Sequence, residues 1–583
     1  MGRGLAFRTL RAAAPTSGPA RCCLPARRAG QQQRLIHSTR GQRSEALGTA
    51  ARLPDAEPVP PRSPRRSVTI ADILERRAKA GRLVAGTAAT ADINLFKAPF
   101  SAGKPRARRW DHHLSAESLS RGPCVLKQAA QHLKKPGLIS LGGGLPCAEN
   151  FPLESLTLRV PSPDAGFTEE ATRAAGRTAR IGKYDAAAGV EAAEFDLSVA
   201  LNYHQAGGSP QLLRWVVEHT ELVCDPPYAD WASCLTVGST AALEQALRMF
   251  CDKDRGDAIL TEEYSFSTAL ETAAPLGVKV FGVPIDGEGL SPQAMDEMLS
   301  SWDPAARGGA RRPHVLYTVP SGQNPTGATQ SAERRKAIYE VCRKHDVFIF
   351  EDEPYYFLQM PPAHAGEQAA AEAETVDEFL GSLIPSLLSI DTDGRVMRMD
   401  SFSKVVVPGS RVGWVTASEQ VIERYLRHAE VCNQGPSGIS QVVLWQLLDE
   451  QWGHEGYLKW LMHLRGEYTR RRDVMVAACD KFLPAEVVSW NAPVAGMFYW
   501  LKVDHTRHPD ASHRSIREIE DEIFDLCIEK GVLVAKGSWF MAEQDKEPSG
   551  LFFRATFAAA SPDKMTEAIH RFGDAVRQSY RMN

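Results

Sequence analysis

One short segment, SFSKVVVPGSRVGW at residues 401–414, holds a lysine, several hydroxyl side chains and a second cation close together. Lys404 is an amine that could form a Schiff base with a carbonyl group. Ser401 and Lys404 also have the S-x-x-K spacing of penicillin-binding proteins and β-lactamases, but the S-D-N and K-T-G strings of those enzymes do not occur here. Arg411 could bind an anionic group. The segment by itself leaves amine chemistry and an ordinary strand-to-loop transition open.

Three other polar motifs follow apolar runs of the chain. GSTAALEQALRMF, residues 238–250, opens a helix whose free N–H groups could bind phosphate, although N-capping by Ser239 is the commoner use of such residues. VPSGQNPTG, residues 319–327, predicts a fixed turn from which Asn324 could direct its amide at a ligand. Asp352 ends a buried strand and needs a partner there, either a protonated pyridine nitrogen or a Lys or Arg side chain.

These motifs together match the needs of one cofactor. A phosphate site, an aspartate for a pyridine nitrogen, an asparagine turn and a reactive lysine are what pyridoxal 5′-phosphate requires of a protein. Each motif alone is weak evidence. All four in this order, each at the end of a predicted strand, predict that the chain binds this cofactor.

The elements that position these motifs lie between residues 230 and 418, where apolar runs alternate with helical patterns such as ERRKAIYEVCRKH at 333–345. This alternation predicts an α/β domain with a mainly parallel sheet flanked by helices. Ligands bind at the carboxyl ends of such strands, where the polar motifs fall. The predicted strands are SCLTV (233–237), AILTE (258–262), VKVFGVP (278–284), HVLYTVP (314–320), VFIFED (347–352), RVMRMDSF (395–402) and RVGWVTA (411–417).

The N-terminal part of the chain has a different character. Residues 1–44 contain nine arginines and no acidic residue, which predicts a mitochondrial transit peptide; a disordered basic tail of a cytosolic protein is the alternative. Residues 45–107 are expected to form a linker or arm with one short helix within 67–83.

The rest of the chain is expected to form two domains. A leading segment and a cofactor-binding large domain would span 108–450, and a smaller α+β domain, with strands in GMFYWLKV and GLFFRATFA, would span 451–583. Residues 168–182 and 363–375 are predicted to be loop insertions.

Composition excludes several classes of protein. The net charge of −3 gives no sign of a nucleic-acid-binding protein, and no apolar run reaches the 18 residues that a transmembrane helix needs. The eleven cysteines are scattered without a C-x-x-C pair, which predicts reduced thiols and no metal site.

The motifs resemble those of the fold-type I aminotransferases that depend on pyridoxal phosphate. The resemblance is greatest to the fungal aromatic amino acid aminotransferases, which are related to kynurenine/α-aminoadipate aminotransferase. It covers about residues 108–583, and it rests on the motifs RWDHHLSAESLSRGP (109–123), ISLGGGLP (139–146), TVGST (236–240), YTVPSGQNPTG (317–327), EDEPYYFLQ (351–359), SFSKVVVPGSRVGW (401–414) and FFRATFA (552–558).

The resemblance implies a role for each matching residue. Lys404 would bind the cofactor covalently and move a proton, Asp352 would pair with the pyridinium nitrogen, and Tyr264 would stack on the ring. Arg554 would bind the substrate α-carboxylate. The remaining roles are Asn324 and Tyr355 at the ring O3′, Ser239, Thr240, Ser401, Ser403 and Arg411 at the phosphate, Gly144 and Asn324 near the substrate, and Tyr203 at the phosphate of a partner subunit.

The reaction implied is a ping-pong transamination. An aromatic amino acid, kynurenine or 2-aminoadipate would donate its amino group, and 2-oxoglutarate would accept it. Because Tyr203 would serve the partner subunit, the expected protein is a homodimer with a shared active site. No nucleic-acid or membrane partner is expected. The expected location is the mitochondrial matrix or, otherwise, the cytoplasm. Relatives often carry an amide side chain at the position of Thr240, so the phosphate contact is least secure there.

Two other functions use the same residues. β-Elimination from a cysteine conjugate would need the same lysine and arginine, and it would release pyruvate. A transcription regulator that senses pyridoxal phosphate would need an N-terminal helix-turn-helix, and residues 45–108 show one possible helix only.

Overall fold

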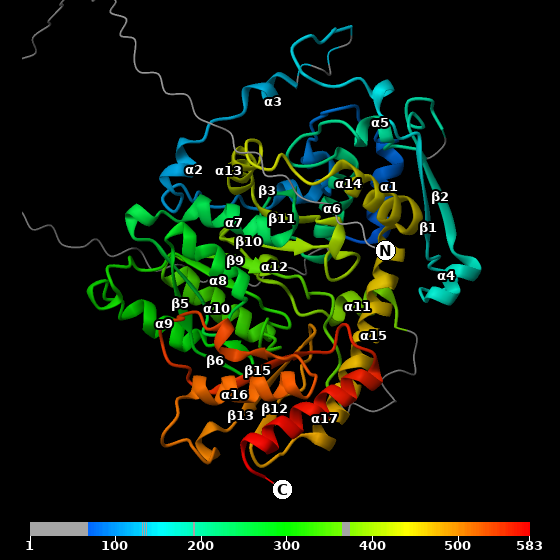
Figure 1. Ribbon diagram of the computed structural model, residues 1–583. Helices are drawn as coiled ribbons and strands as arrows, with labels where there is room; N and C mark the ends of the chain where they lie inside the picture. The colour runs from blue at the N-terminus through cyan, green and yellow to red at the C-terminus, as the bar shows by residue number, and fades with distance from the viewer. Residues whose placement is uncertain are drawn as a thin grey trace, which may run out of the picture. The chain divides into compact units, whose positions relative to one another are not determined.

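The predicted α/β fold is present in the computed structural model, which describes residues 68–582 except 131, 133, 134, 136, 191, 192 and 364–373. A seven-stranded sheet within these residues has the order β3-β11-β10-β9-β8-β4-β5 (Figure 1). Each strand from β10 to β5 pairs in parallel with its neighbour, whereas β11 is antiparallel to both β10 and β3. The strands are β3 (Trp231–Thr236), β4 (Ala258–Glu262), β5 (Lys279–Val283), β8 (Val315–Thr318), β9 (Phe348–Asp352), β10 (Val396–Ser401) and β11 (Gly413–Ser418).

Helices cover both faces of this sheet, which explains why its strands are apolar throughout rather than alternating. In β9, Phe348 and Phe350 pack in the core cluster that contains residues of α7 and α13. Ile349 points to the other face and packs with residues of α9, α10 and α12. The helices are α6 (Pro210–Val223), α7 (Gly238–Phe250), α8 (Ser267–Ala273), α9 (Pro292–Ser300), α10 (Ala332–Lys344), α12 (Leu387–Ile390) and α13 (Glu419–Ala429).

A second, antiparallel sheet follows in the C-terminal part of the chain, with the order β12-β13-β15-β14. The two apolar runs predicted there are β13 (Phe498–Val503) and β15 (Leu551–Thr556). The helices drawn in orange and red lie against this sheet in Figure 1. The other elements of this part are α14 (Gly438–Trp445), a π-helical turn (Gln446–Trp452), α15 (Gly453–Phe482), β12 (Val488–Trp490), α16 (Ile516–Glu529), β14 (Ala535–Lys536) and α17 (Pro562–Ser579).

The described part of the N-terminal arm packs against the large sheet and its helices. The predicted helix is α1 (Ile70–Ala80), and Thr69 and Asp72 form a capping box at its start. Ile73 is fully buried, and Arg77 forms ion pairs with Glu218 and Asp449. Residues 68–107 are therefore a docked arm and not a free linker. Two short helices, α2 (Ala116–Ser120) and α3 (Val125–Ala130), follow it.

The structure corrects the prediction that residues 168–182 form a loop. They contain α4 (Glu169–Ala175) and β2 (Arg177–Gly182), and β2 pairs antiparallel with β1 (Ser155–Val160). Several side chains of this two-stranded ribbon are exposed. A ribbon exposed to solvent does not require a continuous apolar run, so the sequence carries no strand signal here. The remaining α-helices and β-strands of the described residues are α5 (Leu197–Ala200), β6 (Ile285–Asp286), β7 (Gly289–Leu290) and α11 (Val376–Ser382).

Some predictions fall on parts of the chain without a description. The predicted transit peptide, residues 1–44, and most of the predicted insertion at 363–375 lie outside the described residues.

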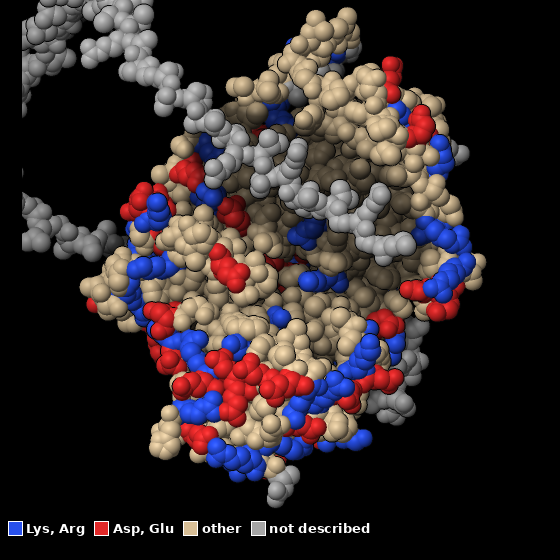
Figure 2. Space-filling model, in the orientation of Figure 1, with Lys and Arg blue, Asp and Glu red and all other residues tan. Residues whose placement is uncertain are grey.

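Among the residues that are described, no helix has both the length and the apolar character needed to cross a membrane. The cysteines in the described ranges are free thiols. On the described part of the face in Figure 2, basic and acidic side chains are interspersed rather than gathered by sign.

Candidate functional site

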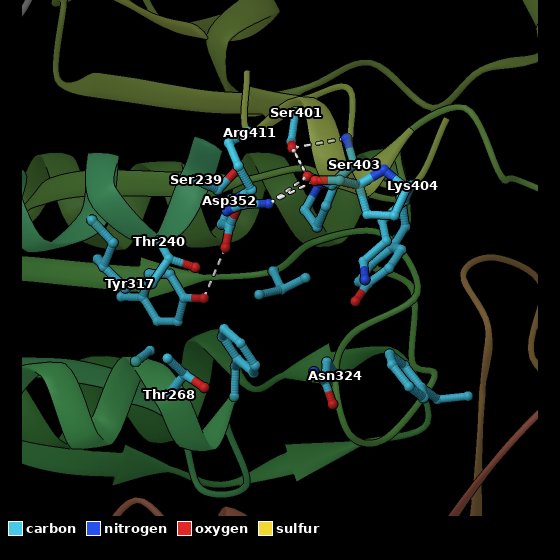
Figure 3. A pocket seen from close by; sticks show the side chains of 18 of the residues that line it. Ser239, Thr240, Thr268, Tyr317, Asn324, Asp352, Ser401, Ser403, Lys404 and Arg411 are labelled. Carbon is cyan, nitrogen blue, oxygen red and sulfur yellow. Dashed lines mark hydrogen bonds between the residues drawn. The ribbon is translucent and has the colours of Figure 1, made fainter. Parts of the chain in front are cut away.

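A cavity of about 360 Å³ lies at the carboxyl ends of β8, β9 and β10, where the first turn of α7 and residues of α8, β13 and β15 also reach it (Figure 3). This is the edge at which a parallel sheet binds its ligands. Ten of the residues predicted from the sequence line it: Ser239, Thr240, Asn324, Asp352, Tyr355, Ser401, Ser403, Lys404, Arg411 and Arg554.

Asp352 is the middle one of three consecutive buried acids whose partners differ. The Glu351 carboxylate accepts hydrogen bonds from the first backbone N–H groups of α12, and Glu353 forms an ion pair with Arg335 at 3.2 Å. Asp352 instead accepts a hydrogen bond from the Tyr317 hydroxyl at 2.9 Å, and its Oδ1 is buried with no partner among the described residues. The alternative of a salt bridge to Lys or Arg is thus found at Glu353 and, through Arg398 at 3.9 Å, at Glu351, but not at Asp352.

The environment of Asp352 fits a cationic ligand. Burial raises the pKa of its carboxyl to about 7, and the Tyr317 hydrogen bond acts in the opposite direction. A protonated ring nitrogen that donates to Oδ1 would favour the carboxylate form and satisfy an otherwise unpaired buried oxygen. The pyridine ring of pyridoxal phosphate carries such a nitrogen.

A cluster of hydroxyl and guanidinium groups lies beside Asp352 in the cavity. The Ser401 hydroxyl donates to Ser403 Oγ at 2.9 Å and accepts from the Ser403 backbone N–H at 3.1 Å, and Arg411 Nη1 donates to Ser403 Oγ at 3.4 Å (Figure 3). Gly238 has a φ of +78°, and a Cβ at this position would lie 2.8 Å from Arg411 Nη2. Glycine therefore lets the guanidinium approach the start of α7 closely.

The N-terminus of α7 does not show the N-capping by Ser239 that the sequence left open as the alternative to phosphate binding. The helix begins at Gly238 after Val237, and no side chain caps it. Ser239 Oγ is instead buried with no partner in the described structure. Uncapped N–H groups, free hydroxyl groups and the Arg411 cation are the donors that a phosphate dianion requires.

Two cations occupy the rest of the cavity. Burial lowers the pKa of Lys404, and the nearby Arg411 and Arg554 lower it further, so more of this amine is neutral than is usual for lysine. Arg554 Nη1 donates to Asn324 Oδ1 at 2.7 Å, and the guanidinium carbon lies 4.5 Å and 4.7 Å from the ring centroids of Phe498 and Phe540. A planar guanidinium held in this way suits a carboxylate.

The structure corrects the residue expected to stack on a ring in the cavity. Tyr264 does not line the cavity; its ring packs on Trp500 and Phe552, and its hydroxyl lies 3.2 Å from Ser549 Oγ. Phe266, two residues later, lines the cavity instead. The segment EEYSFSTAL offers two aromatic residues, and the one directly before α8 is the one that this helix carries to the site.

Two further predicted residues lie outside the cavity, and two others were missed. Tyr203 is 55% exposed, and Gly144 is exposed with no atom within 4 Å of the position of a Cβ. Tyr317 and Thr268 line the cavity without having been predicted to do so. Tyr317 lies inside an apolar strand, where the sequence gives no sign that its hydroxyl has a specific partner.

Comparison with known proteins agrees with this geometry. A family model described as aminotransferase class I and II matches residues 206–572. An aromatic amino acid aminotransferase of Schizosaccharomyces pombe is 44% identical over 473 residues, which are 81% of this chain and 98% of that protein. The mitochondrial kynurenine/α-aminoadipate aminotransferase of Bos taurus is 31% identical over 80% of this chain and 98% of its own. The crystal structure of the aminotransferase Aro8 from Candida albicans matches with a TM-score of 0.76 and 40% identity, over 82% of this chain and 100% of that chain.

Proposed function

This chain belongs to the class I and II aminotransferases, and on that premise we propose that it moves the amino group of an aromatic amino acid to 2-oxoglutarate with pyridoxal 5′-phosphate as its cofactor. Transfer of an amino group between an amino acid and a 2-oxo acid is the activity of the family. One observation carries the proposal of this cofactor: Asp352, whose Oδ1 is buried without a partner in the described structure, lines the same cavity as Lys404 and Arg554.

The residues present fit the cofactor. Asp352 would accept the ring N–H, Asn324 and Tyr355 would hold the ring O3′, and Phe266 would cover the ring. The phosphate would be held by Ser239, Ser401, Ser403, Arg411 and the start of α7, with Thr240 at its edge. When bound, pyridoxal phosphate supplies an electron sink that stabilises negative charge at the substrate α-carbon.

Lys404 would be the proton carrier of the reaction. A general base must be neutral when it takes a proton, and the lowered pKa of Lys404 increases its neutral fraction near neutral pH. Its Nζ would take the proton from the substrate α-carbon and pass it to C4′ of the cofactor, which is the proton shift that amino transfer requires. The cations Arg411 and Arg554, which contribute to the lowered pKa, are the same ones that would bind the two anionic groups of cofactor and substrate.

The rest of the cavity supports an aromatic donor. Arg554 would orient any amino acid or 2-oxo acid through its α-carboxylate, because this group is common to both substrates. Leu243, Phe266, Val319 and Phe498 supply apolar lining of the same cavity, and Phe498 lies against Arg554. Desolvation of an aromatic ring against such a lining is favourable. Kynurenine and 2-aminoadipate remain the other donors to test.

Assembly and location are part of the proposal. The segment 119–141 carries the exposed apolar side chains Leu119, Val125, Leu126, Ile139 and Leu141, and Tyr203 is exposed as well. Exposed apolar patches of this kind support a homodimer, in which Tyr203 would serve the partner subunit's site. The arginine-rich residues 1–44 support the mitochondrial matrix as the location.

The test follows the visible absorption of the purified protein loaded with pyridoxal phosphate. Phenylalanine, kynurenine and 2-aminoadipate are added separately, and each true donor should convert the cofactor to its amino form with loss of the visible band. Addition of 2-oxoglutarate should restore the band. If no donor changes the spectrum, the proposed transamination is refuted. Release of pyruvate from a cysteine conjugate, without this exchange, would favour the β-elimination alternative.

A further inference from the structure

The hydroxyl of Tyr317 donates a hydrogen bond to Oδ2 of Asp352 at 2.9 Å (Figure 3). Tyr317 lies in β8 and Asp352 ends β9, the neighbouring parallel strand. Tyr317 is 1% exposed and Asp352 is 6% exposed, so water does not compete strongly for this contact. Of the two carboxylate oxygens, Oδ2 is occupied by the phenol, and Oδ1 is left unpaired.

Two acidic groups near this carboxylate oppose its ionisation. Asp400 of β10 and Glu262 of β4 are both acidic, and both raise the pKa of Asp352. Glu262 is itself buried and has its own donors, Thr318 at 2.6 Å and Thr261 at 3.1 Å. Tyr317 donates the direct hydrogen bond to Asp352, and the Ser239 hydroxyl, which has no hydrogen-bond partner of its own in the described structure, also lowers the pKa of Asp352.

We propose that Tyr317 is a positioning residue of the cofactor site, which keeps Asp352 ionised and fixes its Oδ1 as the acceptor for the ring nitrogen. The inference rests on the proposed function, because it needs a ring nitrogen in the cavity. Tyr317 touches this nitrogen only through Asp352, and its phenol remains a donor because burial and the Asp352 carboxylate hold the pKa of Tyr317 well above its ordinary value.

Removal of the phenol oxygen has a predictable consequence. In Tyr317→Phe, Oδ2 would lose its donor, and the Asp352 carboxyl would keep its proton up to a higher pH. A neutral carboxyl pairs poorly with a ring cation. Loss of a hydrogen bond to a charged group of this kind should lower the affinity for the cofactor about 10- to 100-fold. The pH at which cofactor affinity falls should also move upward.

The experiment measures cofactor binding rather than turnover. Pyridoxal phosphate is titrated into the cofactor-free protein at a series of pH values from 6 to 9, and binding is followed by quenching of tryptophan fluorescence and by visible absorption. Tyr339→Phe is the matched control, because Tyr339 is also a buried tyrosine that donates to a buried aspartate, Asp391, at 3.0 Å. Tyr339 does not line the cavity.

The inference predicts lower affinity and a higher pH midpoint for Tyr317→Phe, and wild-type values for Tyr339→Phe. In an Asp352→Asn background, the Tyr317→Phe change should have no further effect, because the group that Tyr317 acts on is gone.

Equal binding curves for Tyr317→Phe and Tyr339→Phe would overturn the inference. If Tyr317→Phe does not fold, Tyr317→His is measured in its place and should keep an affinity and a pH midpoint near those of the wild type, because it can retain a donor to Oδ2. A fall in affinity as large as that expected for loss of the donor would then overturn the inference. Failure of the wild-type protein to bind the cofactor would instead overturn the proposed function.

Discussion

The guanidinium of Arg554 donates a hydrogen bond to the side-chain oxygen of Asn324 at 2.7 Å, across a separation of 230 residues. Asn324 lies in the turn after β8 of the large sheet, and Arg554 lies in β15 of the C-terminal sheet. The two sheets therefore meet at one cavity, and the cation from one sheet is held by an amide from the other. This contact places the substrate-binding cation beside the residues that would hold the cofactor.

Arg554→Lys should weaken both substrates together. Lysine lacks the planar fork that binds a carboxylate through two N–H groups, so we expect KM for the amino donor and the oxo acid to rise about 10- to 100-fold. Steady-state kinetics with each substrate varied in turn measures this. Arg571→Lys, at a partly exposed position of α17, is the matched control and should leave both KM values unchanged. A rise for one substrate only would contradict a shared carboxylate site.

Lys404→Ala should remove the proton carrier and the covalent link to the cofactor. We expect the rate of amino transfer to fall by at least about 10²- to 10⁴-fold, which is the usual contribution of a positioned general base. The visible absorption of the lysine-bound cofactor should disappear as well. Lys459→Ala, on the exposed side of α15, serves as the control. Retention of the visible band in Lys404→Ala would show that another amine binds the cofactor.

Because Phe266 lines the cavity and Tyr264 does not, substitutions of the two residues should differ in their effect on cofactor affinity. Phe266→Ala should lower cofactor affinity about 2- to 10-fold, because it removes an aromatic contact worth about 0.5–1.5 kcal/mol. Tyr264→Ala removes a ring that lies outside the cavity and packs on Trp500 and Phe552, so it should affect affinity much less than Phe266→Ala does. Fluorescence titration with pyridoxal phosphate measures both. The reverse order of effects would show that Tyr264 stacks on the ring after all.

Arg77→Ala should destabilise the protein, because it removes the cation that the buried carboxylates of Glu218 and Asp449 share and leaves them only His454 and Arg214 as basic partners. Loss of one partner of a buried ion pair costs about 3–5 kcal/mol, which should appear as lower thermal and urea midpoints. Lys79→Ala, which breaks an exposed pair with Glu75 on the same helix, should change stability by less than about 1 kcal/mol. Equal effects of the two variants would mean that the arm is not anchored through Arg77.

The ion pair between Arg77 and Glu218 should also make the stability of the protein depend on pH. Burial by itself would raise the pKa of Glu218, but hydrogen bonds from His454 and Arg77 outweigh it and hold the pKa at about 2. Ionised Glu218 therefore contributes stability that is fully present above about pH 4.5 and is lost as the pH falls toward 2. The difference in stability between wild type and Arg77→Ala should shrink over this range in a pH series of thermal melts. A constant difference would contradict the assignment.

The sequence by itself determined the sheet, most of its strands and most residues of the cavity. Apolar runs buried on both faces mark the strands, and the polar residue that ends each run must lie at the carboxyl edge of a parallel sheet. Lys404, Asp352 and Asn324 are at that edge for this reason. Arg554 could be assigned through the resemblance of FFRATFA to the family motif, because no pattern within the chain links it to the large sheet.

Only the tertiary structure decided which of several similar residues belongs to the site. Glu351, Asp352 and Glu353 look alike in the sequence, but helix α12 and Arg335 satisfy the outer two and leave Asp352 for a ligand. Phe266 rather than Tyr264 lines the cavity, because the C-terminal sheet and its flanking segment supply the partners of Tyr264. In each case the partner comes from a distant part of the chain. The local sequence carries the chemistry of a side chain, and the packing of remote segments determines whether that chemistry is left free.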